Sequence, residues 1–307
     1  MLESTIIALA AVTAALTAPG PKGPLAGTFL DAGKSAPVVL IIPGSGPTDR
    51  DGNNPLGVTA APYKMLAEAL AERGVSTLRA DKRGMFGSKD AVADANDVRI
   101  ADYVTDARSW IDTLKTRTGA SCVWLLGHSE GGLIALEAAQ DRTSICGVIL
   151  IAAPGRKLGE VMRDQLKASP NTLLEPALAA LGELEAGRAV DATKLPTPLA
   201  TLFNPKVQPF LTDLLAKDPA RLAGGVATPM LIIQGGRDIQ VTERDAKALH
   251  AANPKSQLLV IPTMNHVLKD VANDDRVSNL ATYSDPTLPV DAELVTAIAA
   301  TATPKAR

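Results

Sequence analysis

A doubly wound, mostly parallel α/β sheet is the fold class that the sequence predicts, because short apolar runs alternate with longer segments of helical periodicity. The apolar runs, which we expect to be strands, lie at residues 38–42, 75–78, 123–126, 148–151, 230–233 and 258–261. The expected helices lie at residues 63–72, 101–115, 133–140, 243–252 and 291–300. This alternation is typical of parallel strands joined by crossover helices that cover both faces of one sheet.

The alternation breaks between residues 154 and 225, where no strand pattern occurs. Leucines recur there at helical spacing, and several prolines divide the stretch into short helices. We expect residues 155–225 to form a small helical cap inserted into an α/β core of residues 25–154 and 226–307. Because ligands of open α/β sheets bind at the carboxyl ends of the strands, the cap is predicted to lie there.

Length and composition limit the function classes. With 307 residues, a formal charge of −2 and 21% charged residues, the chain has no basic field to attract nucleic acid or an anionic membrane. No apolar run is long enough to span a bilayer, and no internal repeat occurs. We expect a soluble globular protein with a small-molecule substrate and no nucleic-acid partner. A homodimer is left open.

Residues 1–24 are set apart from the predicted core. Residues 6–18 are apolar and rich in Ala, and Pro19 follows directly. This pattern resembles a short export signal, although Glu3 precedes it and no Lys or Arg does. An ordered N-terminal helix or arm is the other interpretation. The predicted localisation is therefore cytoplasmic, or periplasmic or secreted if residues 1–18 act as a signal.

Cys122 and Cys146 stand just before two consecutive apolar runs, so we expect them near each other at the starts of neighbouring strands. A disulfide between them is geometrically feasible. Small buried thiols are nevertheless the prediction, because two cysteines in a chain of this size do not make a disulfide framework. Neither is close to a His in a motif, so neither is assigned a catalytic role.

The central motif is Gly127-His128-Ser129-Glu130-Gly131. It follows an apolar run and precedes a helical pattern, which is the setting that a Gly-x-Ser-x-Gly nucleophile elbow requires. A side chain at either flanking glycine would clash as the strained turn lifts the serine hydroxyl out of the backbone. Ser129 is therefore the predicted nucleophile.

A serine hydroxyl needs a base to take its proton, and the chain has three histidines. The ring of His128 is expected to diverge from the hydroxyl of its neighbour, and His250 lies within a helical pattern. His266 follows the run 258–261 in a loop that can bring it against Ser129. His266 is therefore the predicted general base.

The predicted acid is Asp238, which would hold the imidazole tautomer and stabilise the imidazolium. It follows the run 230–233 in a Gly-rich turn, again at the carboxyl end of a strand. Asp245 falls inside a helical pattern and Asp270 comes after the histidine, so both suit the role less well.

Two preorganised backbone donors should stabilise the oxyanion of a tetrahedral intermediate. One is the amide of Glu130, the first residue of the elbow helix, where the helix dipole contributes. The second is expected from the loop after residues 38–42, where the amide of Ser45 is favoured and that of Gly46 is the alternative.

No cofactor or metal site is predicted. Pro47 follows the glycines of the segment 44–46, which matches neither Gly-x-Gly-x-x-Gly nor Gly-Lys-Ser/Thr, so phosphate binding is not expected. The two cysteines and three scattered histidines show no ligand spacing.

Three motifs together resemble the α/β-hydrolase superfamily, and within it a group of bacterial carboxylesterases. They are segment 44–52 (GSGPTDRDG), segment 81–88 (DKRGMFGS) and the elbow, and Asn265-His266 completes the likeness. The order Ser, Asp, His along the chain is that of this fold. The resemblance covers nearly the whole chain from about residue 25. It implies a carboxylic ester hydrolase that needs no cofactor and has a modest helical cap.

One position departs from the family pattern. Pro43-Gly44 stands where His-Gly is usual, so the hydrogen bonds that normally brace the oxyanion loop are in question. Asp49, Arg50 and Arg83 are candidates for a bracing ion-pair network in their place.

Related chemistries are separated only in part. Ser129 argues against a dehalogenase or epoxide hydrolase, which would carry Asp at the elbow, and against a dienelactone hydrolase, which would carry Cys. Peptidase, thioesterase, lactonase and acyltransferase activities use the same triad and stay open. A catalytically dead binding protein, the non-enzymatic alternative, would be expected to have lost a triad member or an elbow glycine, and none is missing.

Substrate size is predicted from apolar residues expected above the nucleophile. They are the leucines of the cap together with Phe203, Phe210, Met85, Phe86 and Met264. A cap fixed by their packing should bound the acyl pocket. We expect short acyl esters of about two to six carbons, each fitted methylene contributing roughly 0.8 kcal/mol.

Overall fold

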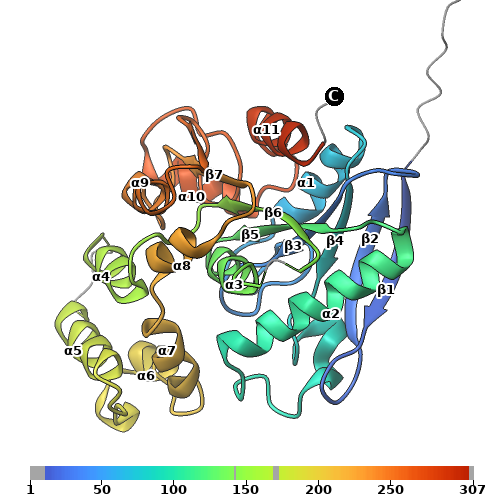
Figure 1. The fold of residues 1–307 in the computed structure, drawn as a ribbon. Helices are drawn as coiled ribbons and strands as arrows, with labels where there is room; N and C mark the ends of the chain where they lie inside the picture. Colours follow the sequence, from blue (N-terminus) through green and yellow to red (C-terminus); the bar gives the residue numbers. More distant parts are fainter. Residues whose placement is uncertain (1–10, 142, 169–172, 304–307) are drawn as a thin grey trace, which may run out of the picture.

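The computed structural model describes residues 11–141, 143–168 and 173–303, in which helices flank a central eight-stranded sheet (Figure 1). The strands are β1 (Val12–Ala18), β2 (Leu25–Asp31), β3 (Val38–Ile42), β4 (Ser76–Ala80), β5 (Val123–His128), β6 (Ile145–Ile151), β7 (Met230–Gly235) and β8 (Gln257–Ile261). Their order is β1-β2-β4-β3-β5-β6-β7-β8. The five pairings from β4 to β8 are parallel, whereas β1/β2 and β2/β4 are antiparallel. The predicted mostly parallel sheet is confirmed.

β1 corrects one interpretation of the N-terminus, an ordered helix, because residues 12–18 form a strand. It pairs with β2 over its whole length, from Val12 opposite Asp31 to Ala18 opposite Leu25. Most of its residues are exposed or half-buried, because it is the edge strand, so its sequence carries no clear alternation of apolar and polar residues. Cleavage after Ala18 would remove this strand. Residues 1–10, the rest of the suggested export signal, lie outside the described residues.

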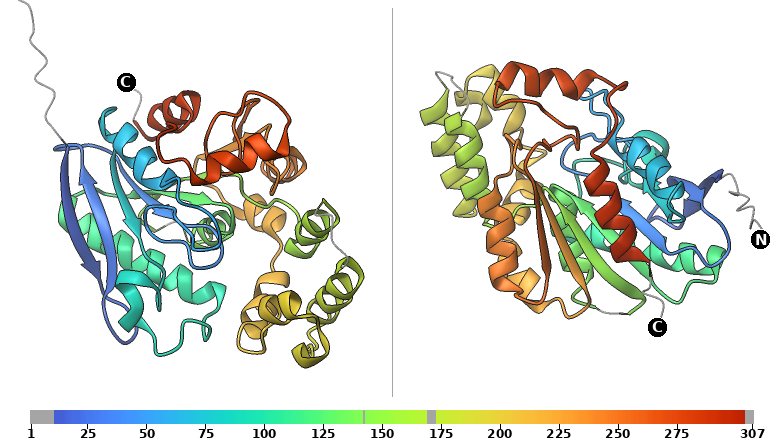
Figure 2. Two further views of the ribbon diagram at one scale, coloured as in Figure 1. Left: turned by 180° about the vertical axis from the view of Figure 1, so that it is seen from behind. Right: turned by 90° about the horizontal axis from the view of Figure 1, so that it is seen from above.

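The helices of the core cover both faces of the sheet (Figure 2). They are α1 (Pro62–Ala71), α2 (Ile100–Thr118), α3 (Glu130–Ala138), α9 (Glu243–Ala252), α10 (Arg276–Ala281) and α11 (Ala292–Ala302), with short 3₁₀ turns η1 (Phe86–Ala91) and η3 (Thr282–Ser284). Within the described ranges, no helix is both long and apolar enough to cross a membrane.

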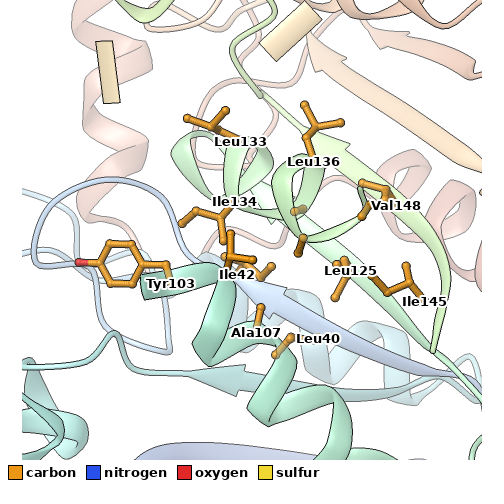
Figure 3. Close-up of a cluster of buried hydrophobic side chains, with 14 of the residues drawn as sticks. Leu40, Ile42, Tyr103, Ala107, Leu125, Leu133, Ile134, Leu136, Ile145 and Val148 are labelled. Atoms are coloured by element: carbon orange, nitrogen blue, oxygen red, sulfur yellow. The ribbon is translucent and has the colours of Figure 1, made fainter. Parts of the chain in front are cut away.

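Alternate residues of each central strand face different helical layers. In β3, Val38, Leu40 and Ile42 join an apolar cluster with α2, α3 and α9, while Val39 and Ile41 join a second cluster with α1 and α11. Figure 3 shows side chains of α2 and α3 meeting those of the strands in the first cluster. A sheet buried on both faces explains why the central strands read as continuous apolar runs.

The described part of residues 155–225 contains helices and no strand. They are α4 (Leu158–Ala168), α5 (Leu174–Glu185), η2 (Ala192–Lys194), α6 (Thr197–Leu202), α7 (Gln208–Leu215) and α8 (Pro219–Gly225). In Figure 1, α4 to α7 form a lobe beside the sheet, on the side away from β1 and β2. Leu181, Phe203 and Leu211 belong to an apolar cluster of this lobe's own.

The lobe is fastened to the core by polar and aromatic contacts. Asp213 on α7 accepts a hydrogen bond of 2.8 Å from the amide of Ile100, the first residue of α2. Phe210 meets Tyr103 of α2 edge to face, with 6.2 Å between ring centroids. Arg156 pairs with the buried carboxylate of Asp245 on α9 at 2.9 Å. These contacts restrict movement of the lobe relative to the sheet.

The two cysteines form a disulfide, which corrects the prediction of free buried thiols. Cys122 precedes β5 and Cys146 lies at the start of β6, and the pairing of these strands brings the two Cα atoms to 5.1 Å. The predicted proximity was right because parallel neighbours begin at the same edge of the sheet. The small number of cysteines was the misleading argument, since one bond needs only two suitably placed thiols.

Candidate active site

Ser129 occupies the sharp turn between β5 and α3. Its backbone angles, φ 53° and ψ −124°, are sparsely populated by residues with a side chain. The turn is held by its own amide, which donates to the carbonyl of Ile151 on the neighbouring strand at 3.0 Å. Because the side chain is only half-buried, the hydroxyl is accessible at the carboxyl edge of the sheet, as in a nucleophile elbow.

Gly127 and Gly131 are required by the close passage of the backbone around this turn. A Cβ on Gly127 would lie 2.3 Å from the carbonyl oxygen of Gly131, and one on Gly131 would lie 2.2 Å from that of Ile42. The obstacle in each case is backbone, which cannot swing aside. The two glycines therefore let α3 begin directly against the ends of β5 and β3.

His266 and Asp238 are hydrogen-bonded to each other at the ends of β8 and β7. His266 Nδ1 donates to Asp238 Oδ2 at 2.8 Å, which leaves Nε2 unprotonated in the neutral ring and able to accept a proton. Asp238 Oδ1 accepts from the amides of Gln240 and Val241 at 2.7 and 2.9 Å. The carboxylate is thus fixed from its other side by backbone donors.

Asn265 holds the loop that carries the histidine. Its side chain is fully buried, and its Oδ1 accepts from the amides of Val267 and Lys269, both at 3.1 Å. Its Nδ2 donates to Asn279 at 3.1 Å and to Thr282 at 2.7 Å, side chains on α10 and η3. The loop is therefore tied to the core on both sides of His266.

The elbow and the histidine loop lie against each other. The rings of His128 and His266 have centroids 4.7 Å apart, and the carbonyl of His266 lies 2.9 Å from His128 Nε2. Within the described residues, the Ser129 hydroxyl makes no hydrogen bond to His266. In hydrolases without substrate this contact is often long and tightens when the substrate binds.

The predicted oxyanion loop follows β3 and passes beside Ser129, the predicted nucleophile. A Cβ on Gly44 would lie 3.3 Å from the Cβ of Ser129, so the loop and the elbow are in contact. Among the described residues, neither the amide of Ser45 nor that of Glu130 donates to a protein acceptor. The amide of Gly46 donates to no protein acceptor there either, so the free amides of the loop and of α3 fit the predicted pair of oxyanion donors with Ser45 or Gly46 as the second member.

Tyr63 and His128 link this loop to the histidine loop, although neither was predicted to act at the site. The Tyr63 hydroxyl lies 3.1 Å from the amide nitrogen of Gly44 and 2.8 Å from His128 Nδ1. Burial, together with the neighbouring ring of His266, lowers the pKa of His128 to about 3, and burial raises the pKa of Tyr63. Both groups are therefore neutral at physiological pH.

Lys82 and Glu130 form a second buried contact at the oxyanion loop. Lys82 Nζ lies 3.0 Å from Glu130 Oε1, and both side chains are only 4% exposed. The ammonium also donates to the carbonyl of Gly46 at 3.4 Å and lies 5.3 Å from the ring centroid of Tyr103. It thereby neutralises the carboxylate that stands next to the nucleophile.

Asp49, Arg50 and Arg83 do not form the single ion-pair network suggested by the sequence. Arg50 pairs with Asp81, and Arg83 pairs with carboxylates at the start of α2. Asp49 accepts instead from amides of its own loop. Arg83 lies in segment 81–88 and contacts α2. Arg50 lies in the loop after β3 and contacts Asp81, so the two arginines have different partners.

Phe203 and Met264 do not provide apolar surface above Ser129. Both are fully buried, Phe203 in the cluster of the helical lobe and Met264 in the cluster of α1 and α11. Phe86 is 44% exposed and Met85 is half-buried. Helically spaced apolar residues of the lobe pack its own core first, which sequence spacing alone cannot distinguish from a substrate wall.

The sheet order, the strained serine after β5, and the acid and histidine after β7 and β8 together define the class of protein: the chain has the α/β-hydrolase fold. Solved structures share this fold. Esterase Pf2001 of Pyrococcus furiosus matches with a TM-score of 0.56 at 16% identity, over 81% of each chain. Est1E of Butyrivibrio proteoclasticus matches with a TM-score of 0.57 at 17% identity, over 94% of this chain and 98% of its own.

Sequence comparison gives more specific relatives. The chain is 33% identical to Esterase EstD of Thermotoga maritima over 243 residues, which are 76% of this chain and 54% of that protein. It therefore spans about half the length of this curated relative. The family model described as serine aminopeptidase, S33, matches residues 56–191, a range that includes the elbow.

Proposed function

We propose that this protein is a serine carboxylesterase that hydrolyses short-chain carboxylic esters through an acyl-enzyme. The observation that carries the proposal is the hydrogen bond from His266 to a doubly anchored Asp238, at the same edge of the sheet as the strained Ser129. The similarity to an esterase of Thermotoga maritima supports it.

The reaction follows from the roles of these groups. Ser129 Oγ attacks the ester carbonyl while His266 Nε2 takes its proton, and the charge of Asp238 stabilises the imidazolium. The amides of Ser45 and Glu130 donate to the oxyanion. His266 returns the proton to the departing alcohol, leaving an acyl group on Ser129. Water, deprotonated by the same imidazole, then releases the carboxylic acid and regenerates the serine.

The preference for short acyl chains rests on the attachment of residues 155–225 as a cap. The Asp213–Ile100 hydrogen bond, the ring contact of Phe210 and the ion pair of Arg156 hold this lobe in place. A lobe held at several points cannot easily swing open like the lid of a lipase. We therefore expect a bounded acyl pocket that is filled by about two to six carbons.

Covalent labelling tests the nucleophile. Fluorophosphonate should label the wild type and a Ser121→Ala control, in which an exposed serine outside the site is removed. It should fail to label Ser129→Ala and His266→Ala. Ester hydrolysis should fall by about 10⁴-fold or more in Ser129→Ala. Labelling of Ser129→Ala equal to that of the control would refute the assignment.

A substrate series tests the chain length. Catalytic efficiency is measured with p-nitrophenyl acetate, butyrate, octanoate and palmitate, and with acyl thioesters to separate thioesterase activity. The expected optimum lies at acetate or butyrate. An optimum at palmitate with activation by lipid droplets would instead identify a lipase whose lobe opens.

An aminopeptidase is the second candidate, because the matching family model carries that description. Such an enzyme needs carboxylates free to bind the substrate's ammonium group. Glu130 and Asp238, the carboxylates beside the nucleophile and the base, are already paired with Lys82 and His266, which favours the esterase. Hydrolysis of alanyl or leucyl p-nitroanilide faster than of p-nitrophenyl butyrate would reverse this choice.

A further inference from the structure

The hydrogen bonds around His128 can run in only one direction. The carbonyl of His266 is an acceptor, so His128 Nε2 must carry the proton and donate to it. In the neutral ring Nδ1 is then an acceptor, and the hydroxyl of Tyr63 donates to it. The phenol oxygen in turn accepts from the amide of Gly44. Every donor in this chain of three hydrogen bonds has one acceptor.

This chain of hydrogen bonds connects the segments that carry the reacting groups. Gly44 precedes the predicted oxyanion donor Ser45, and His128 precedes the nucleophile Ser129. The third contact is made by the backbone of His266 itself, the predicted base. Tyr63 supplies the connection from α1. It packs in the apolar cluster of α1 and α11, on the face of the sheet opposite to α3.

The arrangement also explains how the oxyanion loop is held without the usual histidine. Pro43 offers neither a side-chain donor nor an amide proton, so residue 43 cannot brace the loop by donating a hydrogen bond. The amide of Gly44 is instead bound by a fully buried phenol whose ring is fixed by packing. The partner that holds this amide therefore lies outside the loop, on α1.

We propose that Tyr63 and His128 are positioning residues that hold the Ser45 amide and the His266 ring in register with Ser129. Neither touches the substrate. Their contribution is geometric, because a displacement of about 1 Å in an oxyanion donor or a base can cost on the order of 100-fold in rate. The inference rests on the proposed esterase function and names residues that this function alone does not require.

The test compares two buried phenols. Tyr63→Phe removes the central hydroxyl, and Tyr283→Phe is the matched control, since it removes a buried hydroxyl that is bonded to the side chain of Gln240 and not to the oxyanion loop. For p-nitrophenyl butyrate we expect kcat of Tyr63→Phe to fall by roughly 10- to 100-fold with KM changed less than about 3-fold. The affinity for a trifluoromethyl ketone, which forms the oxyanion, should fall in parallel. The control should keep wild-type values.

A second pair of variants separates positioning from folding. His128→Gln keeps a donor near the position of Nε2 and should retain more of kcat than His128→Phe, which has neither donor nor acceptor. Equal melting temperatures of the two Tyr→Phe variants would exclude unfolding as the cause of the difference in rate. Wild-type kcat in Tyr63→Phe, while Ser129→Ala stays inactive, would refute the positioning role and leave the esterase intact. Activity in Ser129→Ala would refute the proposed function itself.

Discussion

Lys82→Met is expected to destabilise the protein far more than the loss of an ordinary surface charge. Lys82 and Glu130 are each only 4% exposed, and their polar atoms are 3.0 Å apart. Removing one partner of such a pair leaves an uncompensated charge in the interior, which typically costs about 3 to 5 kcal/mol. About 4 kcal/mol corresponds to a change of roughly 1,000-fold in the unfolding equilibrium.

The double variant Lys82→Met/Glu130→Gln supplies the decisive comparison. In the double variant neither member of this pair is charged, so neither leaves an unpaired charge in the interior. The free energy of unfolding should therefore return to within about 1 to 2 kcal/mol of the wild type. The amide of residue 130 is unchanged by the substitution. Esterase activity should therefore survive better in the double variant than in Lys82→Met.

Urea unfolding followed by tryptophan fluorescence measures these differences, because Trp110 and Trp124 are both buried. Lys64→Met is the matched control: Lys64 lies 4.0 Å from Glu68, and both side chains are about half exposed. Its cost should stay below about 1 kcal/mol. If Lys82→Met cost no more than Lys64→Met, the interpretation of Lys82 as a buried counter-charge would be wrong.

Three further variants test other parts of the structure. Asp238→Asn should lower kcat by about 10³- to 10⁴-fold through loss of the tautomer restraint, and a rate near wild type would mean that another carboxylate orients His266. The double variant Cys122→Ser/Cys146→Ser, which opens a link across 24 residues, should lower the free energy of unfolding by about 3 kcal/mol; no change in the urea midpoint would contradict a disulfide in the folded protein. The pKa of His128 is lowered to about 3 in the folded protein. Below about pH 6.5 the unfolded state therefore binds a proton at this residue that the folded state does not bind, and the free energy of unfolding falls as the pH falls. Between pH 7 and pH 5, His128→Gln should therefore lose about 2 kcal/mol less than the wild type; equal losses in urea titrations would show that His128 is not held neutral.

The fold was predictable where burial is complete. β3 and β5 to β7 are covered on both faces, so each is a short apolar run that needs no partner to be recognised. β1 and β2 escaped detection because an edge pairing decides their structure. Pairing between strands is a property of the folded chain, and no local pattern encodes it.

The residues of the candidate site likewise fall into a group that the sequence predicts and a group that only the folded structure reveals. The elbow, the acid and the base are recognisable because each has a fixed position relative to a strand, so the chain order alone suggests their roles. Tyr63, His128 and Lys82 act through partners 65, 138 and 48 residues away. Their residue types suit many other roles, and only the folded structure gives them these contacts. Segment 81–88 drew attention as a motif, but the sequence did not indicate that its lysine reaches the elbow helix.

The support of the oxyanion loop follows from these distant contacts. On one side of Ser45 the amide of Gly44 donates to Tyr63, and on the other side the carbonyl of Gly46 accepts from Lys82. One contact uses a backbone donor and the other a backbone acceptor, and the amide of Ser45 between them, the predicted oxyanion donor, donates to no acceptor among the described residues. Because Tyr63 lies on α1 and Lys82 follows β4, the position of this amide depends on the packing of the core as well as on the loop itself, in which Thr48 Oγ1 donates to the Ser45 carbonyl at 2.9 Å. Tyr63 and Lys82 thus hold Gly44 and Gly46 although the neighbouring Pro43 has no donor of its own.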